Sequence, residues 1–458
     1  KELTSGYVQI TTRANFQLRL IKPRDAPEVL RRIQSVGLHT RGAGADNIRN
    51  LTANPTAGID PYELIDVSPF CHELGQFIIN NREFYDLPRK FNVAFDGGGL
   101  IGTVQDTNDI GVRAVRTLRD HEDLKAGVYF RIALGGATGH QAFARDMEVL
   151  VRPEQILKVL VAMIRVYIAN GNRTDRKKAR LKHLLESWSL EKFLAETEGL
   201  LGSKLTRAPT NTNVSAPFEE PRAAPPVPHS HVGVFAQKQG GLNYLGVAVP
   251  VGQITPKQLL RLAEIADLYG SGEIRLTVWQ NLILPNISDA YVETVKKAVV
   301  KVGLDWRQSH LRSGLVACTG NSYCKFASAN TKGHALEIAD YLEKRMVLDQ
   351  PLNIHLTGCP NSCAQHYMGD IGLLATKVKV SGETVEGYHV FVGGGFGANQ
   401  AVGRQVFQGI SVQQLKPTLE KMLHAYLNRR TAAETFQSFT RRHDLNTLQK
   451  LFSGGDDG

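Results

Sequence analysis

The chain has 458 residues, 42% of them apolar and 21% charged, which is the composition of a folded globular protein with room for two or three domains. No apolar run is long enough to predict a membrane-spanning helix, so a membrane partner is not expected. The net charge of +10 lacks the aromatic interleaving of single-strand binders, which argues against nucleic acid. Only five cysteines occur, which excludes a disulfide framework and favours a reducing compartment, the cytoplasm or a plastid stroma.

The first patterned segment, residues 7–38, returns later in the chain as residues 273–304. The two align without a gap at an offset of 266, as Thr11 does with Thr277. Each copy has the pattern of a strand, a turn and an amphipathic helix that ends at glycine. The same offset places Thr52 opposite Cys318, and later matches join residues 109–111 to 370–372 and 134–139 to 392–397. A duplication is therefore predicted, with two halves facing each other across a pseudo-twofold axis and a cofactor between them.

The elements between and within the copies follow from proline, charge and apolar pattern. Residues 153–169 predict an apolar helix with Pro153 in its first turn. Residues 173–183 are a basic helical stretch, interpreted either as a solvated face or as a docking face for an acidic partner. Six prolines between residues 206 and 231 predict an extended linker. A strand near 244–251 and a helix over 256–269 then open the second copy; no counterpart precedes residue 7, so the chain is expected to begin inside its first domain.

Four of the five cysteines form two spaced pairs, Cys318-x5-Cys324 and Cys359-x3-Cys363. Thiolates at these spacings, on loops that can wrap a bulky object, suit a cubane iron–sulfur cluster. Structural zinc sites use about two to four intervening residues, so zinc remains an alternative that fits the longer gap poorly. Thiols without a metal are the third interpretation. The remaining cysteine, Cys71, lies in a helical pattern and is expected to be a core residue.

The strings around these cysteines are specific. Cys318-Thr-Gly-Asn-Ser-Tyr-Cys324 and Leu356-Thr-Gly-Cys-Pro-Asn-Ser-Cys363, followed by Asp370-Ile-Gly372, resemble the cluster segments of the sirohaem-dependent nitrite and sulfite reductases. The resemblance runs from residue 6 almost to the C-terminus. It implies a [4Fe-4S] cluster bound by all four cysteines and a sirohaem whose iron shares the sulfur of Cys363.

The resemblance also implies an architecture. The expected fold is α+β with mixed sheets, internally duplicated, with two sirohaem and cluster-type domains, a ferredoxin-like half-repeat domain and the cofactors at their interface. Residues 1–38 would be the remainder of a first ferredoxin-like half-repeat and 39–205 the first reductase domain. Residues 206–231 would be the linker, 232–302 the second half-repeat, and 303–458 the second reductase domain with the cofactor ligands.

In this family the substrate anion lies on the far side of sirohaem, inside a ring of basic residues. By resemblance, residues 11–17 supply Arg13, residues 46–50 supply Arg49, and residues 87–92 supply Lys90 and Asn92. Sulfite reductases typically carry a second lysine where this chain has Asn92. A doubly charged anion gains more from a fourth cation, whereas singly charged nitrite needs less charge and more directed hydrogen bonds. The alternative is a purely structural role, in which these residues only form salt bridges at strand ends.

Other residues near the matched strings are weaker candidates. Some are expected either to contact the tetrapyrrole or to have a purely structural role: Arg19, Arg41, Arg89, Arg307, Lys325, Gln280 and Asn281. Glycine-rich residues 97–99, 135–139 and 393–397 predict close backbone packing, since no strand–loop–helix unit with a trailing acid accompanies them. Histidines near the cofactor loops, His140, His355 and His366, are expected outside the ligand set.

The function implied by the resemblance is the six-electron reduction of nitrite to ammonia by a monomer. Because no flavin or nicotinamide module is visible, electrons would come from ferredoxin or a similar small acidic carrier. The net charge of +10 suits an anionic substrate and an acidic donor. Assimilatory sulfite reduction is the main alternative. A relative that oxidises a corrin precursor and a non-catalytic electron-transfer or nitrite-sensing protein are the others.

Overall fold

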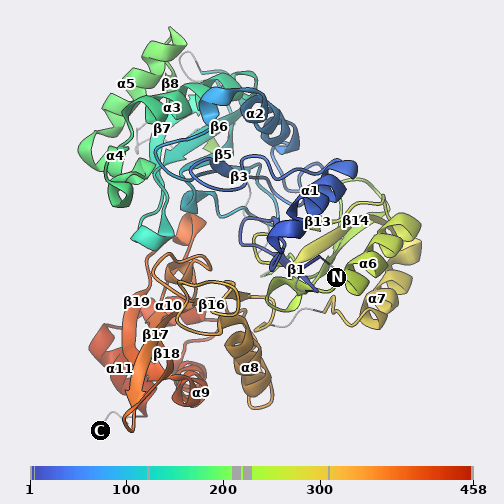
Figure 1. Ribbon diagram of the computed structural model, residues 1–458, viewed down its shortest axis with the longest axis vertical. Coiled ribbons are helices and arrows are strands. Elements are labelled where there is room, and N and C mark those ends of the chain that lie inside the picture. The colour runs from blue at the N-terminus through green and yellow to red at the C-terminus, as the bar shows by residue number, and fades with distance from the viewer. Residues whose placement is uncertain are drawn as a thin grey trace.

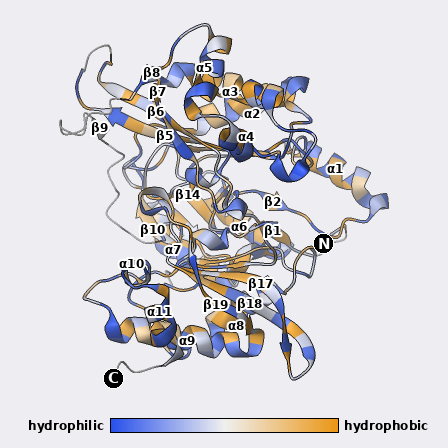
Figure 2. Ribbon diagram, turned by 90° about the vertical axis from the view of Figure 1, so that its left-hand side faces the viewer, coloured by the Kyte–Doolittle hydropathy of each residue, from blue (hydrophilic) through white to orange (hydrophobic). Residues whose placement is uncertain are grey.

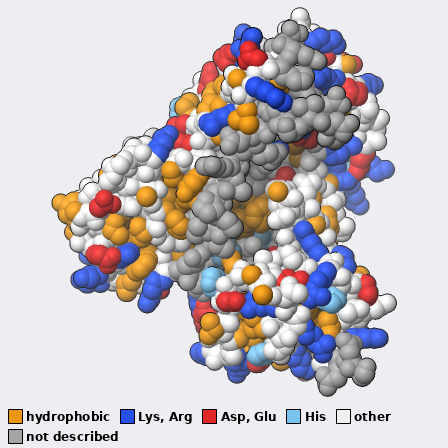
Figure 3. All heavy atoms as spheres, turned by 180° about the vertical axis from the view of Figure 1, so that it is seen from behind, with side chains coloured by type: hydrophobic (Ala, Val, Ile, Leu, Met, Phe, Trp, Pro, Cys, Tyr) orange, Lys and Arg blue, Asp and Glu red, His pale blue; other side chains and the backbone are white. Residues whose placement is uncertain are grey.

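The computed structural model describes residues 3–4, 6–120, 124–208, 218–219, 229–307 and 310–454. Three lobes surround a common centre, and each contains a β-sheet of its own (Figure 1). Hydrophobic residues concentrate in the strands and in the helix faces that pack on them (Figure 2). Lys and Arg side chains on the back of the molecule are scattered over all three lobes (Figure 3). Within the described residues, no helix is both long and apolar enough to cross a membrane.

The upper lobe of Figure 1 has a mixed sheet of order β3-β4-β5-β6-β7-β8. The first three strands run parallel and the others pair antiparallel. Its core lies between this sheet and α3, the predicted apolar helix, which is buried along most of its length. The elements are β3 (Ile48–Thr52), β4 (Phe91–Asp96), β5 (Ile110–Thr117), β6 (Gly127–Leu134), β7 (Arg145–Val151), β8 (Thr206–Arg207), α2 (Ser68–Asn80), α3 (Ile156–Asn170), α4 (Leu181–Ser187) and α5 (Leu190–Leu201).

The lower lobe repeats this plan with the order β15-β16-β17-β18-β19. Again the first three strands are parallel and the rest antiparallel, and helices again cover the sheet. The two lobes therefore are copies of one fold. The elements are β15 (Leu315–Ala317), β16 (Ile354–Thr357), β17 (Ile371–Val380), β18 (Glu383–Val392), β19 (Arg404–Ser411), α8 (Thr331–Glu343), α9 (Val412–Arg429), α10 (Phe436–Arg442) and α11 (Leu445–Ser453).

The third lobe combines the start of the chain with its middle. The predicted repeat is visible here, because α1 (Ala26–Ser35) and α7 (Val292–Lys301) differ by the same offset of 266 at both ends. Helix α6 (Pro256–Tyr269) begins with a capping box in which Thr255 and Gln258 satisfy each other's backbone amides. The strands are β1 (Val8–Ile10), β2 (Phe16–Gln17), β10 (Gly233–Ala236), β11 (Leu242–Val247), β12 (Gln253–Ile254), β13 (Arg275–Leu276) and β14 (Leu282–Ser288).

Part of the predicted linker, residues 206–231, falls outside the description. Residues 209–217 and 220–228 lie outside the described residues. The described parts include β8, which pairs with β7, and β9 (Phe218–Glu219), which pairs with β5. This segment therefore returns along the sheet of the upper lobe at two points.

The strand register corrects one detail of the predicted repeat. Asp109 and Asp370 are equivalent, because each accepts a bond from the backbone amide of Asn92 or Asn353, at 3.0 and 2.7 Å. Following the ladders outward from them makes Thr52 equivalent to Val316 rather than to Cys318. The counterpart of Cys318 is Asn54, because the amide of Gly97 donates to Asn54 Oδ1 at 2.7 Å as that of Gly358 donates to Cys318 Sγ at 3.1 Å. The constant offset failed because the spacing between the copies changes before β3.

The two lobes also exchange loops. The turn at Gly139 of the upper lobe packs so tightly on the cysteine loop that an added Cβ would lie 2.9 Å from Asn361 O. The turn at Gly397 of the lower lobe reaches back, and its amide donates to Asp106 Oδ2 at 2.8 Å. Each half thus completes the other at the place where their sheets end, which positions the cysteine loop against the upper lobe.

The hydrogen bonds of Asn54 predict a measurable cost of removing it. Its amide also donates to Asp96 Oδ1 at 3.1 Å and Ile101 O at 2.9 Å, and the residue is 5% exposed. We expect Asn54→Ala to lower the free energy of unfolding by about 2–4 kcal/mol, since it leaves buried donors and acceptors unpaired. Urea unfolding measures this, with Asn80→Ala at the exposed C-terminal end of α2 as control. Equal denaturation midpoints for Asn54→Ala, Asn80→Ala and the wild type would show that the hydrogen bonds of Asn54 do not stabilise the fold.

Candidate active site

The structure brings the four predicted ligand cysteines together at one edge of the lower sheet. Cys318 follows β15 directly and Cys359 follows β16 by two residues, and these strands are parallel neighbours. The thiols lie within electrostatic reach of one another. Burial raises the pKa of Cys359, and the nearby Cys318 and Cys324 raise it further. Burial and then Cys318 raise the pKa of Cys363 to about 11, although Lys90 opposes this.

The loops around these thiols fit a large, soft-ligand cofactor. Ser328 N donates to Gly358 O at 2.8 Å and Cys318 N to Leu356 O at 3.0 Å, which joins the two cysteine loops. Gly358 is needed at this contact, because a Cβ there would lie 2.6 Å from Ala327 Cβ. Its amide bonds to Cys318 Sγ, the kind of hydrogen bond that tunes iron–sulfur clusters. In the described part of the chain, no three His, Cys, Asp or Glu side chains converge as the ligands of a single metal ion would.

Arg13 lies directly against the loop of Cys363. The hydroxyl of Thr12 donates to Cys363 O at 2.9 Å, and the Arg13 guanidinium donates to Thr107 O at 3.2 Å. With the Gln365 amide oxygen facing it, the guanidinium also donates to that oxygen at 2.7 and 3.1 Å. Burial lowers the pKa of Arg13 to about 10, while Asp109 and Cys363 act in the opposite direction. Arg13 therefore presents its charge beside the thiol of Cys363.

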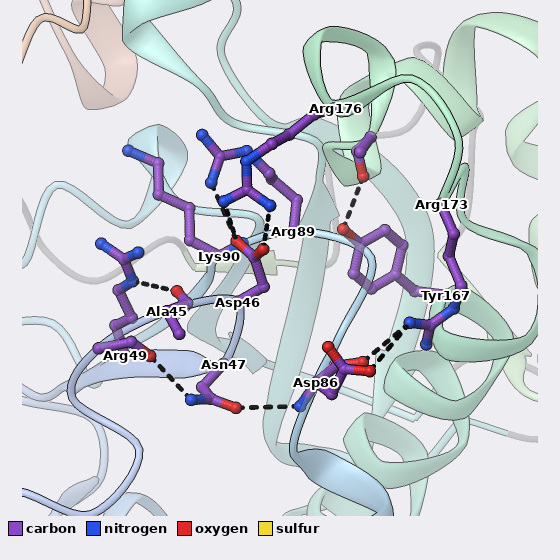
Figure 4. Close-up of polar contacts among 12 residues, drawn as sticks. Ala45, Asp46, Asn47, Arg49, Asp86, Arg89, Lys90, Tyr167, Arg173 and Arg176 are labelled. Atoms are coloured by element: carbon purple, nitrogen blue, oxygen red, sulfur yellow. Dashed lines mark hydrogen bonds and ion pairs between the residues drawn. The ribbon is translucent and has the colours of Figure 1, made fainter.

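Lys90 and Arg49 add two further charges on this side. Burial lowers the pKa of Lys90, as do Arg180 and Arg49, whereas Cys363 raises it. Burial and the neighbouring Arg89 also lower the pKa of Arg49, whose Nε donates to Ala45 O at 2.7 Å. Figure 4 shows the side chains of Arg49 and Lys90 extending to the same side. Arg13 and Lys90 thus both act on Cys363, and Arg49 lies close enough to Lys90 to act on its charge.

Asn92 joins them as an oriented hydrogen-bond donor. Asn15 Nδ2 donates to Asn50 Oδ1 at 2.7 Å, and Asn50 Nδ2 donates in turn to Asn92 Oδ1 at 2.9 Å. This chain of amides occupies the side-chain oxygen of Asn92 and thereby fixes the orientation of its amide. Asn15 and Asn50 were not predicted as site residues. Their contribution is visible only in the fold, which joins the side-chain amides of the three asparagines by hydrogen bonds.

The predicted basic stretch, residues 173–183, contributes inward to this site, which neither sequence interpretation anticipated. Arg180 is 9% exposed and binds Asp109 through several bonds of 2.9 to 3.0 Å. Arg176 and Arg89 both close on Asp46, as Figure 4 shows. Asp46 Oδ1 also accepts the backbone amide of Lys90 at 3.2 Å. Asp46 and Asp109 therefore hold the cationic cluster together, although among the described residues neither forms an ion pair with Arg13, Arg49 or Lys90.

The remaining candidates divide between the site and the surface. Arg41 lines an open cavity of about 420 Å³ with Arg82 and Tyr85. Arg19 donates to Thr319 Oγ1 at 2.9 Å, which places it beside the first cysteine. Arg307 instead turns to Asp305 on the surface, so the structure does not bring it to the other residues. The contacts of Gln280 and Asn281 are to the backbone of Ala317, Ile10 and Val249.

Histidines and the fifth cysteine lie outside the ligand set. His355 Nδ1 lies 2.8 Å from Ala364 O, and His366 Nδ1 lies 2.9 Å from Ser362 Oγ, so both support the cysteine loop. His140 stacks edge-on against His183 at 5.0 Å. Cys71 packs beside the core of the upper lobe, where burial raises the pKa of its thiol to about 12.

Comparison with known proteins agrees with this geometry. The family model described as nitrite and sulphite reductase 4Fe-4S domain matches residues 44–205 and 310–451. The chain belongs to the nitrite and sulfite reductase family. A second model, the nitrite/sulfite reductase ferredoxin-like half domain, matches residues 235–302. The predicted family, the duplicated α+β fold and the [4Fe-4S] cluster are thereby confirmed.

Individual relatives extend the match over most of the chain. The ferredoxin--nitrite reductase of Synechococcus elongatus is 36% identical over 423 residues, 91% of this chain and 79% of that protein. The chloroplastic ferredoxin--nitrite reductase of Arabidopsis thaliana is 34% identical, with 91% and 70% covered. Sulfite reductase [ferredoxin] 1 of Mycolicibacterium paratuberculosis is 32% identical, with 98% and 79% covered. The structure of Mycobacterium tuberculosis NirA superposes with a TM-score of 0.87 at 29% identity, covering 98% of this chain and 80% of that one.

The lowered pKa of Lys90 predicts how anion binding depends on pH. Because its pKa lies below that of a free lysine, Lys90 loses its charge at a lower pH, and the dissociation constant for an anion should rise as the solution becomes alkaline. Nitrite titrations of the purified protein from neutral pH to just below the Arg13 pKa of about 10 measure this. Lys90→Arg should keep its affinity to higher pH, and Lys90→Gln should bind weakly throughout. The same pH profile in Lys90→Gln and wild type would contradict the role.

Proposed function

We propose that this chain reduces nitrite to ammonia in six electron steps, with electrons from ferredoxin or a similar small acidic carrier. The observation that carries the proposal is that Arg13 and Lys90 act on Cys363, with Arg49 near Lys90 and the amide of Asn92 held by Asn50. Ferredoxin--nitrite reductases at 32–36% identity support the same reaction. When bound, the [4Fe-4S] cluster and sirohaem would supply the electron transfer itself.

The donor set fits a sirohaem at this place. A tetrapyrrole with carboxylate groups needs cations around it and a soft ligand for its iron. Cys363 is the cysteine on which Arg13 and Lys90 act, so its thiolate would be the soft ligand that the protein offers to the sirohaem iron. Arg41 and Arg89 would hold carboxylates at the rim. This assignment extends the predicted roles of these residues and rests on their chemistry.

The polypeptide would bind and orient the anion. Arginine forks can bind two oxygens at once, and fixed positive charge stabilises electron-rich nitrogen–oxygen groups as electrons arrive. Arg13 and Arg49 would supply that charge, and the NH2 group of Asn92 would select a planar, singly charged ligand. Lys90 would add a proton source, because its lowered pKa makes the ammonium a better acid than a free lysine.

An acidic donor protein would dock where the cluster comes nearest the surface. Phe326, two residues after Cys324, is 63% exposed, and the ammonium of Lys325 lies 5.3 Å from the centre of its ring. An exposed aromatic ring with an adjacent cation suits an acidic partner surface. The net charge of +10 favours the same encounter.

The oligomeric state, the location, the domain boundaries and the alternative substrate complete the proposal. The chain would act as a monomer in the cytoplasm or in a plastid stroma, and chloroplastic relatives are consistent with the second location. Its domains would divide at residues 38, 205, 231 and 302. Sulfite reduction stays the second candidate, favoured by the relative named sulfite reductase and disfavoured by Asn92.

A steady-state assay with a reduced viologen dye tests the reaction. We expect ammonia from nitrite at a higher kcat/KM than sulfide from sulfite. Faster sulfide formation would replace the proposal with its alternative, oxidation of a corrin precursor would indicate the biosynthetic relative, and no turnover with a loaded protein would indicate a sensor or carrier.

Asn92→Lys tests the basis of the preference. A fourth cation should raise kcat/KM for sulfite relative to nitrite by roughly tenfold, since one charged hydrogen bond contributes about that much. Asn92→Gln, which keeps the amide, serves as the matched control. An unchanged ratio of the two kcat/KM values in Asn92→Lys would remove the argument for nitrite.

A further inference from the structure

A buried lysine lies behind the first cysteine of the cluster loop and has no counter-charge in the described protein. Lys332 is the second residue of α8 and is 4% exposed. Its ammonium donates to Ala317 O at 3.2 Å and to Val251 O. Among the described residues, no carboxylate lies within ion-pair distance of it. Burying a charge without a partner is expensive, so a neighbouring negative group is required.

The surroundings of Lys332 all point to Cys318 as the source of that charge. Ala317, whose carbonyl binds the ammonium, directly precedes Cys318. Thr331, next to Lys332, donates to Cys318 O at 2.8 Å and lies 3.6 Å from its Sγ. Burial, partly offset by the charge of Cys318, lowers the pKa of Lys332 to about 7. Among the residues that the structure describes, the groups that would bring negative charge to this place are the cluster thiolates.

The backbone is shaped to hold the ammonium there. Val251 has a φ of 46°, in the left-handed region that β-branched residues rarely adopt, and this conformation accompanies the contact of its carbonyl with Lys332. The N-terminus of α8 lies at the same point, because Thr331 is its first residue. Helix dipole and ammonium therefore present positive charge to Cys318 together.

A second cation lies on the same side of the loop. Arg19 donates to Thr319 Oγ1 at 2.9 Å, and its charge acts on Lys332 as well. Its Nε is buried without a hydrogen-bond partner among the described residues. Two cations thus lie near Cys318 and Thr319.

We infer that Lys332 is the buried counter-charge of the iron–sulfur cluster and raises its reduction potential, with Arg19 adding a smaller effect. A cluster gains negative charge when it takes up an electron, so a fixed positive charge beside one of its thiolates stabilises the reduced form. Lys332 would thereby make the cluster easier to reduce by the external donor. The inference rests on the proposed cofactor but holds whichever anion is reduced.

A redox titration of the purified holoenzyme, followed by electron paramagnetic resonance of the reduced cluster with mediator dyes and no donor protein, tests this. Lys332→Gln keeps a donor for the two carbonyls but removes the charge. We expect the equilibrium constant for cluster reduction to fall about tenfold, which is 59 mV towards negative potential for one electron. Lys332→Arg should stay near the wild-type potential. The matched control is Lys344→Gln at the exposed C-terminal end of the same helix, which should leave the potential unchanged.

The outcomes separate a charge effect from a structural one. A Lys332→Gln protein that unfolds more easily but keeps the wild-type potential would overturn the inference and leave Lys332 as a structural donor. If Lys332→Gln fails to assemble the cluster by iron analysis, Arg19→Gln decides: a more negative potential supports the inference, and an unchanged one overturns it. If Lys332→Gln shows the expected shift towards negative potential but the wild-type protein does not reduce nitrite, only the proposed substrate is wrong.

Discussion

The loop that carries Cys363 is held from both sides, and the site depends on that contact. Thr12 and Gln365 join the turn after β1 to this loop, and the Gly139 turn of the upper lobe packs on Asn361 within it. The lower lobe provides the cysteines, whereas the upper lobe and the start of the chain provide the anion-binding cations. Neither set is a reaction centre alone. A change in the packing of the lobes would separate the electron store from the substrate.

Several cations of the molecule form no ion pair with a carboxylate among the described residues. Arg180 and Arg89 have carboxylate partners, but Arg13, Lys90 and Lys332 form no ion pair within the described residues. Buried cations of this kind are stable only when a ligand supplies the missing charge. On one side of Cys363 the ligand would be a small anion, and on the other it would be a cluster with four thiolates. The protein thus provides positive charge for two negatively charged ligands, the small anion and the cluster.

Local pattern predicted much of the fold. The turn of residues 11–15 and that of 277–281 have the same hydrogen bonds, and Ala14 and Gln280 share a left-handed conformation, as the gapless repeat predicts. Helices α3 and α6 also follow from apolar pattern, proline and capping residues. The equivalence of Thr52 and Cys318 was wrong because an alignment at constant offset cannot show a change of spacing, whereas strand register can.

Motif strings predict one part of the candidate site, and tertiary contacts that no string contains add the rest. The four cysteines and the cations Arg13, Arg49 and Lys90 lie in recognisable strings. Arg176 and Arg180 lie in a stretch whose basic composition resembles a solvated surface, and only the fold turns them towards Asp46 and Asp109. The amide row ending at Asn92 joins three distant segments, so no local pattern contains it.

We propose that the sulfur atom of Cys363 connects the [4Fe-4S] cluster to the sirohaem at the junction of the two halves. Mössbauer spectroscopy of the purified, iron-57-enriched protein tests it most directly. If Cys363 serves both groups, the sirohaem iron and the cluster irons should be magnetically coupled in every oxidation state. Two independent iron spectra, or iron without a tetrapyrrole, would contradict it.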